Sequence, residues 1–124
     1  MKEKELRGKI RDELERMGFV LWFAPAYGKM RWDIFTIFDL VAVHKSTIAE
    51  VNFIQFTTMS HVSHRRRKIF EWMIENDVFV PNAWLYCYDL DKETFKIHPL
   101  DMDELLKFKH REHDNEGRKK TEFI

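Results

Sequence analysis

Residues 39–68 of this chain read DLVAVHKSTIAEVNFIQFTTMSHVSHRRRK, and this stretch decides the fold. It holds most of two apolar segments, 34–44 and 48–58, whose aromatic and β-branched residues are typical of strands. A connector of three residues separates them, which predicts an antiparallel hairpin. The second segment is apolar on both faces around residues 53–56, as expected for a central strand covered on both sides. The stretch ends in a helix that carries four consecutive cations.

The remaining elements are predicted from the spacing of apolar residues along the rest of the chain. They are a helix over 2–17, a strand over 19–24, a loop over 25–33, a helix from Ser60 or Ser63 as N-cap to Asn76, strands over 83–90 and 94–100, and a helix over 100–108. The resulting order, α-β-β-β-α-β-β-α, predicts an α/β fold in which a central mixed sheet is flanked by helices. Residues 1–108 are expected to form one domain, and the charged residues 109–124 a flexible tail.

The overall composition limits the kinds of partner that the chain can bind. Its 21 basic and 21 acidic side chains cancel, which excludes a uniformly basic nucleic-acid binder. Any site for a polyanion must therefore come from local segregation of charge. Cys87 is the single cysteine, which excludes an intrachain disulfide and a zinc site built from cysteines. The charged N-terminus and the lack of an apolar run of about 20 residues predict a cytoplasmic protein without membrane association.

Three polar residues interrupt the apolar strands of the predicted hairpin. Asp39 lies between Phe38 and Leu40, where an unpaired carboxylate would be expensive to bury. Buried carboxylates are concentrated at functional sites, although a hydrogen-bonded Asp at a strand bend is the structural alternative. On the facing strand, Gln55 and Thr57 share one face. Gln55 offers a carbonyl oxygen for a cation or an ordinary core hydrogen bond, and we expect it near Asp39 at one end of the sheet.

The helix after the hairpin begins with the cations Arg65, Arg66, Arg67 and Lys68. Cations in the first turn oppose the helix macrodipole, which favours an anionic partner over a merely solvated surface. A phosphate group bound by these side chains and by the free N–H groups of the first turn would compensate. Lys29 and Arg31 lie in the predicted loop and are expected to extend this nucleic-acid-binding surface.

In combination, FDLVAV (38–43), FIQFTT (53–58) and VSHRRRKI (62–69) resemble the PD-(D/E)xK nuclease superfamily, which has the restriction-endonuclease-like fold. They are similar in particular to small archaeal and phage Holliday-junction-resolvase-like proteins. The resemblance covers about residues 5–90 and implies a core of order α-β-β-β-α-β. It further implies a DNA endonuclease that depends on Mg²⁺ or Mn²⁺, comes from an archaeon or a virus, and acts as a homodimer.

The resemblance also implies roles for individual residues. Asp39 matches the first metal-binding acid, while Gln55 and Thr57 occupy the positions of the acid and the lysine in E-x-K. Gln55 would then be the second metal ligand. A subset of resolvase-like proteins has such a Gln-x-Thr strand followed by an Arg-x-x-Lys helix, which Arg65 and Lys68 match. Lys68 would thus supply the cation that Thr57 lacks.

Other carboxylates are candidates for completing the metal site. The superfamily often has a catalytic Glu in the first helix, and Glu13 is the first candidate here, with Glu5 behind it. Asp33, at the end of the predicted loop, is a further one. An alternative register uses Glu50 and Asn52 as the acid motif, but these residues are farther from the basic helix.

These assignments predict the hydrolysis of DNA phosphodiesters, with branched DNA such as Holliday junctions as the substrate. The alternative is a catalytically inactive protein of the same fold that binds nucleic acid or a protein partner, because glutamine is a weaker ligand than glutamate and threonine carries no charge. A structural or assembly domain is the third hypothesis. In that case the eleven Phe and four Trp would mark a protein interface.

Overall fold

The computed structural model describes residues 1–27, 30–31, 33–35, 37–46 and 50–111, with the backbone alone for 26–27 and 30–31. The elements are α1 (Glu3–Arg16), β1 (Phe19–Phe23), β2 (Ala26–Tyr27), β3 (Met30–Arg31), β4 (Leu40–His44), β5 (Val51–Thr58), η1 (Met59–His61), α2 (Val62–Glu75), β6 (Ala83–Asp89) and β7 (Thr94–Pro99). A last helix covers 102–111. Among the described residues, no helix combines the length and the hydropathy needed to cross a bilayer.

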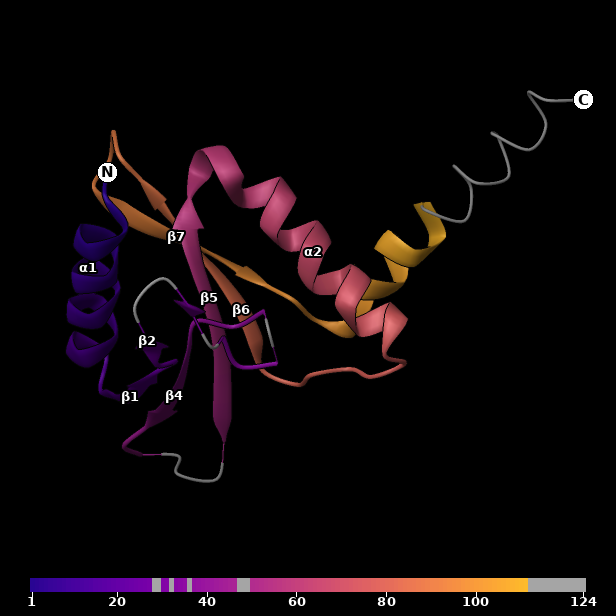
Figure 1. The fold of residues 1–124 in the computed structure, drawn as a ribbon, viewed down its shortest axis with the longest axis horizontal. Helices are drawn as coiled ribbons and strands as arrows, with labels where there is room; N and C mark the ends of the chain where they lie inside the picture. Colours follow the sequence, from indigo (N-terminus) through magenta and orange to yellow (C-terminus); the bar gives the residue numbers. More distant parts are fainter. Residues whose placement is uncertain (28–29, 32, 36, 47–49, 112–124) are drawn as a thin grey trace, which may run out of the picture.

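Five strands form one mixed sheet in the order β1-β4-β5-β6-β7 (Figure 1). β5 and β6 run parallel, and the other neighbouring strands are antiparallel. β4 and β5 form the predicted antiparallel hairpin, with Leu40 opposite Ile54 and Val43 opposite Val51. β5 therefore occupies the centre of the sheet, which confirms the prediction made from its two-sided apolar pattern.

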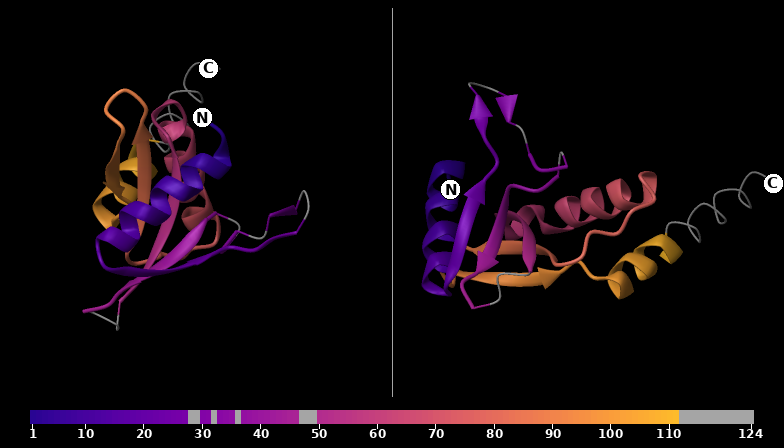
Figure 2. Two further views of the ribbon diagram at one scale, coloured as in Figure 1. Left: turned by 90° about the vertical axis from the view of Figure 1, so that its left-hand side faces the viewer. Right: turned by 90° about the horizontal axis from the view of Figure 1, so that it is seen from below.

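Helices cover the sheet on both faces, as Figure 1 and the second view of Figure 2 show. α1 packs on one face through Leu6, Ile10 and Leu14, which join a core with buried side chains of β4, β5 and β6. α2 and the helix over 102–111 contribute to a second core on the other face. The predicted α/β class, with helices flanking a mixed sheet, is thus confirmed.

The segment before β4 differs most from the prediction. β2 and β3 form a short antiparallel arm that projects from the sheet, where a loop is expected (Figure 2). The strand expected over 34–44 begins only at Leu40. Before it, the amides of Ile37 and Phe38 both donate to the carbonyl of Ile34, at 3.2 and 2.9 Å. These hydrogen bonds close a tight turn, so the apolar residues there cannot belong to an extended strand.

The start of α2 and the end of the chain also differ from the predictions. α2 follows directly on η1, and its N-cap is His61, with no side-chain cap hydrogen bond. Neither Ser60 nor Ser63 is therefore the N-cap. The last helix continues through 109–111, where a flexible tail is expected, and residues 112–124 lie outside the described part of the chain.

Candidate functional site

Asp39 lies immediately before β4, at the point where pairing with β5 ends. It is 9% exposed, and its Oδ2 accepts a hydrogen bond of 2.9 Å from the amide of Phe56. Its own amide donates to the carbonyl of Ile54 at 3.0 Å. The carboxylate thus takes the place of a backbone carbonyl as the acceptor for a β5 amide. This geometry holds the charge of Asp39 at the open end of the β4–β5 hairpin.

A cleft of about 260 Å³ opens beside Asp39, between the start of α1, the end of β5 and the residues of η1 and α2 that follow. Asp39, Thr57 and Arg65 line it, so the structure brings together three residues that were proposed from the sequence. Glu3 and His61 also line the cleft. We call the space between these five residues the Asp39 cleft.

A smaller pocket adjoins the Asp39 cleft and shares Glu3 and Asp39 with it. Arg7 and Asp33 are the other charged residues of its lining. Three carboxylates, from α1 and from the chain before β4, therefore face one small region beside a guanidinium group. Lining a pocket is not coordination, however. Within the described residues, no group of three or more His, Cys, Asp or Glu side chains is arranged to hold a metal ion.

Gln55 lies on β5 two residues before Thr57, on the same face of the sheet. It is 3% exposed, and its Oε1 has no hydrogen-bond partner among the described residues. A buried polar atom without a partner costs about 1–3 kcal/mol, so its presence needs an explanation. An amide oxygen is a suitable ligand for a hard cation. Asp39 and Gln55, the two predicted metal ligands, are thus both buried near this end of the hairpin.

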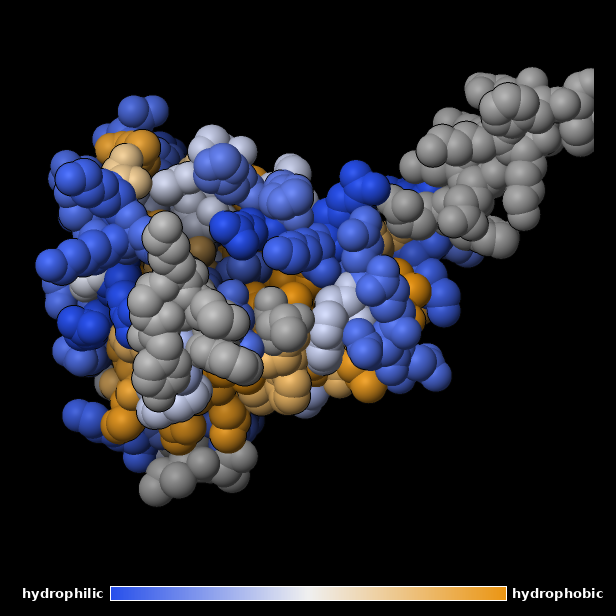
Figure 3. Space-filling model, viewed as in Figure 1, coloured by the Kyte–Doolittle hydropathy of each residue, from blue (hydrophilic) through white to orange (hydrophobic). Residues whose placement is uncertain are grey.

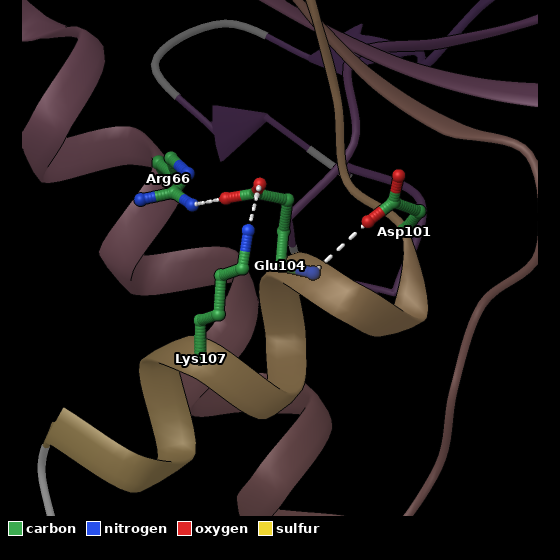
Figure 4. Close-up of polar contacts among 4 residues, drawn as sticks. All are labelled: Arg66, Asp101, Glu104 and Lys107. Atoms are coloured by element: carbon green, nitrogen blue, oxygen red, sulfur yellow. Dashed lines mark hydrogen bonds and ion pairs between the residues drawn. The ribbon is translucent and has the colours of Figure 1, made fainter.

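The four consecutive cations of α2 point in different directions. Arg66 forms an ion pair with Glu104 of the last helix (Figure 4). Its guanidinium also lies over the ring of Phe70, with 5.1 Å between Cζ and the ring centroid. Arg67 pairs with Glu71 one turn further along α2, at 2.8 Å. Both arginines therefore have acidic partners within the protein.

The pocket on the Arg66 side of α2 has about 330 Å³ and includes Arg66, His98 and Glu104 in its lining. Burial lowers the pKa of His98, and the charges of Lys96 and Arg66 lower it further, while Glu104 acts in the opposite direction. The lowered pKa favours the neutral form of His98, and Glu104 pairs with both Arg66 and Lys107 (Figure 4). Because the cation of this pocket, Arg66, is already paired with Glu104, we assign the site to the Asp39 cleft.

Arg65 and Lys68 belong to the other side of α2. Arg65 lines the Asp39 cleft, and Lys68 is exposed three residues further along the helix. Neither forms an ion pair within the described part of the chain. Lys29 lies outside the described residues, and only the backbone of Arg31, in β3, is described. Arg65 and Lys68 are therefore the two predicted cations that are placed to bind an anionic group.

The acid of α1 that lines the Asp39 cleft is Glu3 and not Glu13. The two residues are about 15 Å apart along the helix, at a rise of 1.5 Å per residue. Glu13 pairs with Arg16 at 2.8 Å and lines a different pocket, of about 420 Å³, together with Tyr88. Glu5, the second candidate on α1, is exposed and belongs to neither lining.

The alternative register through Glu50 and Asn52 is not supported by the contacts. The Asn52 side chain donates to the carbonyl of Ala42 at 3.2 Å and accepts from the Trp84 indole at 3.0 Å, so its polar atoms have structural partners. Glu50 is exposed and precedes β5, at the end of that strand opposite the Asp39 cleft.

Neither Glu3 nor His61 was among the residues proposed from the sequence. Glu3 is one of many charged residues on an amphipathic helix, and only the packing of α1 shows which end of the helix meets Asp39. His61 offered a better signal, because it directly precedes the basic helix and is four residues before Arg65.

No known protein family, curated protein or solved structure matches this chain. The function must therefore be argued from the chemistry of the Asp39 cleft itself.

If Arg65 and Lys68 bind phosphates of DNA, replacing both by Gln should reduce the salt dependence of that binding. Each lost phosphate contact lowers the slope of log K against log salt by about 1, so the double variant should lose about 2. Titrations of labelled DNA by fluorescence anisotropy at several salt concentrations measure this slope. Arg66→Gln is the matched control, because Arg66 pairs with Glu104, and its slope should stay at the wild-type value. An equal loss in both proteins would contradict the assignment of Arg65 and Lys68.

Proposed function

We propose that this protein is a metal-dependent endonuclease of the PD-(D/E)xK type, which hydrolyses phosphodiesters of DNA, including branched DNA such as Holliday junctions. The observation that carries the proposal is the Asp39 cleft. There a buried carboxylate and the guanidinium of Arg65 line one space, and the partnerless oxygen of Gln55 is buried on the adjacent strand. In this arrangement the carboxylate of Asp39 can bind a cation while the guanidinium of Arg65 binds the phosphate beside it.

The carboxylate and amide oxygens of this region are the kind of ligand that Mg²⁺ and Mn²⁺ prefer. Asp39 and the Gln55 Oε1 would hold the ion, and Glu3 and Asp33, which line the smaller pocket together with Asp39, are the candidates to complete its ligands. Mg²⁺ is commonly bound by one or two carboxylates together with waters and substrate phosphates, so a sparse set of protein ligands is sufficient. When bound, such an ion polarises the phosphoryl oxygen and lowers the pKa of its water.

The remaining side chains of the cleft act on the phosphate. Arg65 and Lys68 would bind the nonbridging oxygens and balance the charge that develops on them, a contribution that a neutral side chain cannot make. The Thr57 hydroxyl, at the position of the family's lysine, would orient a water or a phosphate oxygen through a hydrogen bond. Asp39 is held in place by the Phe56 amide, so its carboxylate does not have to reorganise during the reaction.

A second function is favoured by the same two residues of β5. Gln55 and Thr57 stand where the superfamily has an acid and a lysine, and both replacements remove a charge from the site. In this alternative the protein has lost cleavage and binds nucleic acid or a protein partner through Arg65 and Lys68. Binding would then persist in EDTA and in variants that lack the carboxylate of Asp39.

We also propose that the protein is a homodimer. β1 is an edge strand whose residues are all uncharged, and on its face away from α1 Val20 is 60% and Trp22 is 55% exposed. Val51 of β5 is 41% exposed, and apolar side chains gather over β1, β4 and the start of β5 in Figure 3. Unprotected edges and apolar patches of this kind are typical of protein interfaces. A second copy would supply the second site needed to cut a symmetric junction.

The proposed activity is tested by incubating the purified protein with a four-way junction, a linear duplex and a single strand of the same sequences. We expect cleavage in Mg²⁺ or Mn²⁺ and none in EDTA, followed on denaturing gels. Cleavage that is unaffected by EDTA would argue against the metal site. A complete lack of cleavage, combined with salt-sensitive binding, would support the inactive alternative.

A further inference from the structure

Phe35 occupies an unusual position in the turn before β4. It is 49% exposed and has a φ of +54°, in the left-handed region that a phenylalanine rarely adopts. The turn that holds it is closed by an antiparallel bridge in which the amide of Ile34 donates to the carbonyl of Phe38 at 2.8 Å. Glycine or asparagine would fit this backbone with less strain. The backbone of the turn therefore does not explain why an aromatic ring is found at its exposed tip.

The ring of Phe35 is held in one orientation by two other aromatic rings. It stacks on Trp72 of α2, with centroids 5.6 Å apart and an interplanar angle of 29°, and it contacts Phe53 at a centroid distance of 5.6 Å. About half of the residue nevertheless faces solvent. An aromatic ring that is supported by other rings and still half exposed is the kind of surface on which a nucleotide base can stack.

Trp72 lies on the same side of α2 as the two available cations. Positions 65, 68 and 72 are separated by three and four residues, the spacing of neighbours on one side of a helix. Arg65 at the cleft and Trp72 at the ring stack are about 10 Å apart along the helix axis. A row therefore leads from the Asp39 cleft past Arg65 and Lys68 to Phe35. Cations next to exposed aromatic rings are the combination used to bind single strands.

We propose that Phe35, supported by Trp72, is a stacking platform for an unpaired base of a nucleic acid whose phosphates are bound by Arg65 and Lys68. This inference rests on the proposed function for the position of the phosphate, and it deepens that function by naming the substrate class. The preferred substrate has at least one unpaired base beside the phosphate in the Asp39 cleft. Within a continuous duplex each base is already stacked on its neighbours, so single strands, forks and unpaired ends bind more tightly.

The test compares wild type with two variants of Phe35. Phe35→Leu removes the flat ring but keeps an apolar side chain against Phe53 and Trp72, whereas Phe35→Tyr keeps the ring. Binding is measured in EDTA by anisotropy, with a single strand, a blunt duplex and the same duplex carrying an unpaired 2-aminopurine. Burial raises the pKa of the Cys87 thiol to about 11, so slow reaction with a thiol reagent verifies a native core in each protein.

In wild type we expect quenching of the 2-aminopurine fluorescence and preferential binding of the two substrates with unpaired bases. Phe35→Leu should bind these two substrates about tenfold more weakly than wild type, while its affinity for the blunt duplex should stay the same. Phe35→Tyr should have the affinities of wild type for all three nucleic acids. Equal affinity of wild type for all three nucleic acids, without quenching, would overturn the inference even if the protein cleaves DNA. Conversely, quenching and preference without any cleavage would support the platform and reject the nuclease.

Discussion

Asp39→Asn is expected to lower metal-dependent cleavage by at least about 100-fold while the fold remains intact. A carboxylate ligand contributes several kcal/mol to metal binding and to charge stabilisation, and about 1.4 kcal/mol corresponds to a factor of ten in rate. The asparagine removes the charge but keeps a side-chain oxygen. This oxygen can still accept the hydrogen bond from the amide of Phe56 at the end of the hairpin. Initial cleavage rates in Mn²⁺, together with thermal unfolding of both proteins, separate the chemical effect from the structural one.

Two further variants test whether the loss of cleavage is specific to the carboxylate of Asp39. Asp39→Ala should also lose stability, by about 1–3 kcal/mol, because the amide of Phe56 is left without its acceptor. Asp77→Asn is the matched control, since Asp77 is exposed just after α2, at the end of that helix opposite Arg65. Its rate should equal that of wild type. An Asp39→Asn protein that cleaves at the wild-type rate would place the metal elsewhere and would remove the main support of the proposed function.

The sequence predicts the sheet well because β5 carries a signal on both of its faces. Ile54 and Phe56 face the core under α1, and Phe53 faces the core under α2, so the middle of the strand has apolar side chains on both faces. Such a pattern is possible only at the centre of a covered sheet. The turn before β4 has no comparable pattern in the sequence. Its apolar residues are typical of a strand, and the hydrogen bonds that bend the chain at Ile34 are formed by backbone groups that any sequence provides.

The composition of the site is less predictable than its location. The spacing of Arg65 and Lys68 predicts that they share one side of α2, because helical periodicity assigns residues to sides. It does not show that Arg66, the next residue, meets Glu104 of a helix 38 residues later in the chain. Glu3 and Glu13 illustrate the same limit, since both are polar positions of one amphipathic helix. Which end of α1 approaches Asp39 is decided by the packing of the whole sheet.

Gln55→Glu is expected to make the stability of the protein strongly dependent on metal. In EDTA the new carboxylate is buried next to the end of the hairpin that holds Asp39, and burial and like charge both oppose its ionisation. We expect a destabilisation on the order of 3 kcal/mol at pH 7, which lowers Tm by roughly 10 °C for a chain of this size. The loss should shrink as the pH falls toward about 4.3, the ordinary pKa of glutamate, because the protonated side chain has no charge.

A divalent cation should reverse this effect, since a ligand that binds only the folded state raises its stability. Differential scanning calorimetry in EDTA and in millimolar Mn²⁺ should therefore give a larger metal-induced rise in Tm for Gln55→Glu than for wild type. Gln55→Leu is the control. It removes the partnerless Oε1 without adding a charge, so it should be about 1 kcal/mol more stable than wild type in EDTA and respond least to Mn²⁺. If Mn²⁺ shifts the Tm of all three proteins equally, Gln55 is not beside a metal, and the oxygen buried on the central strand must be explained by packing alone.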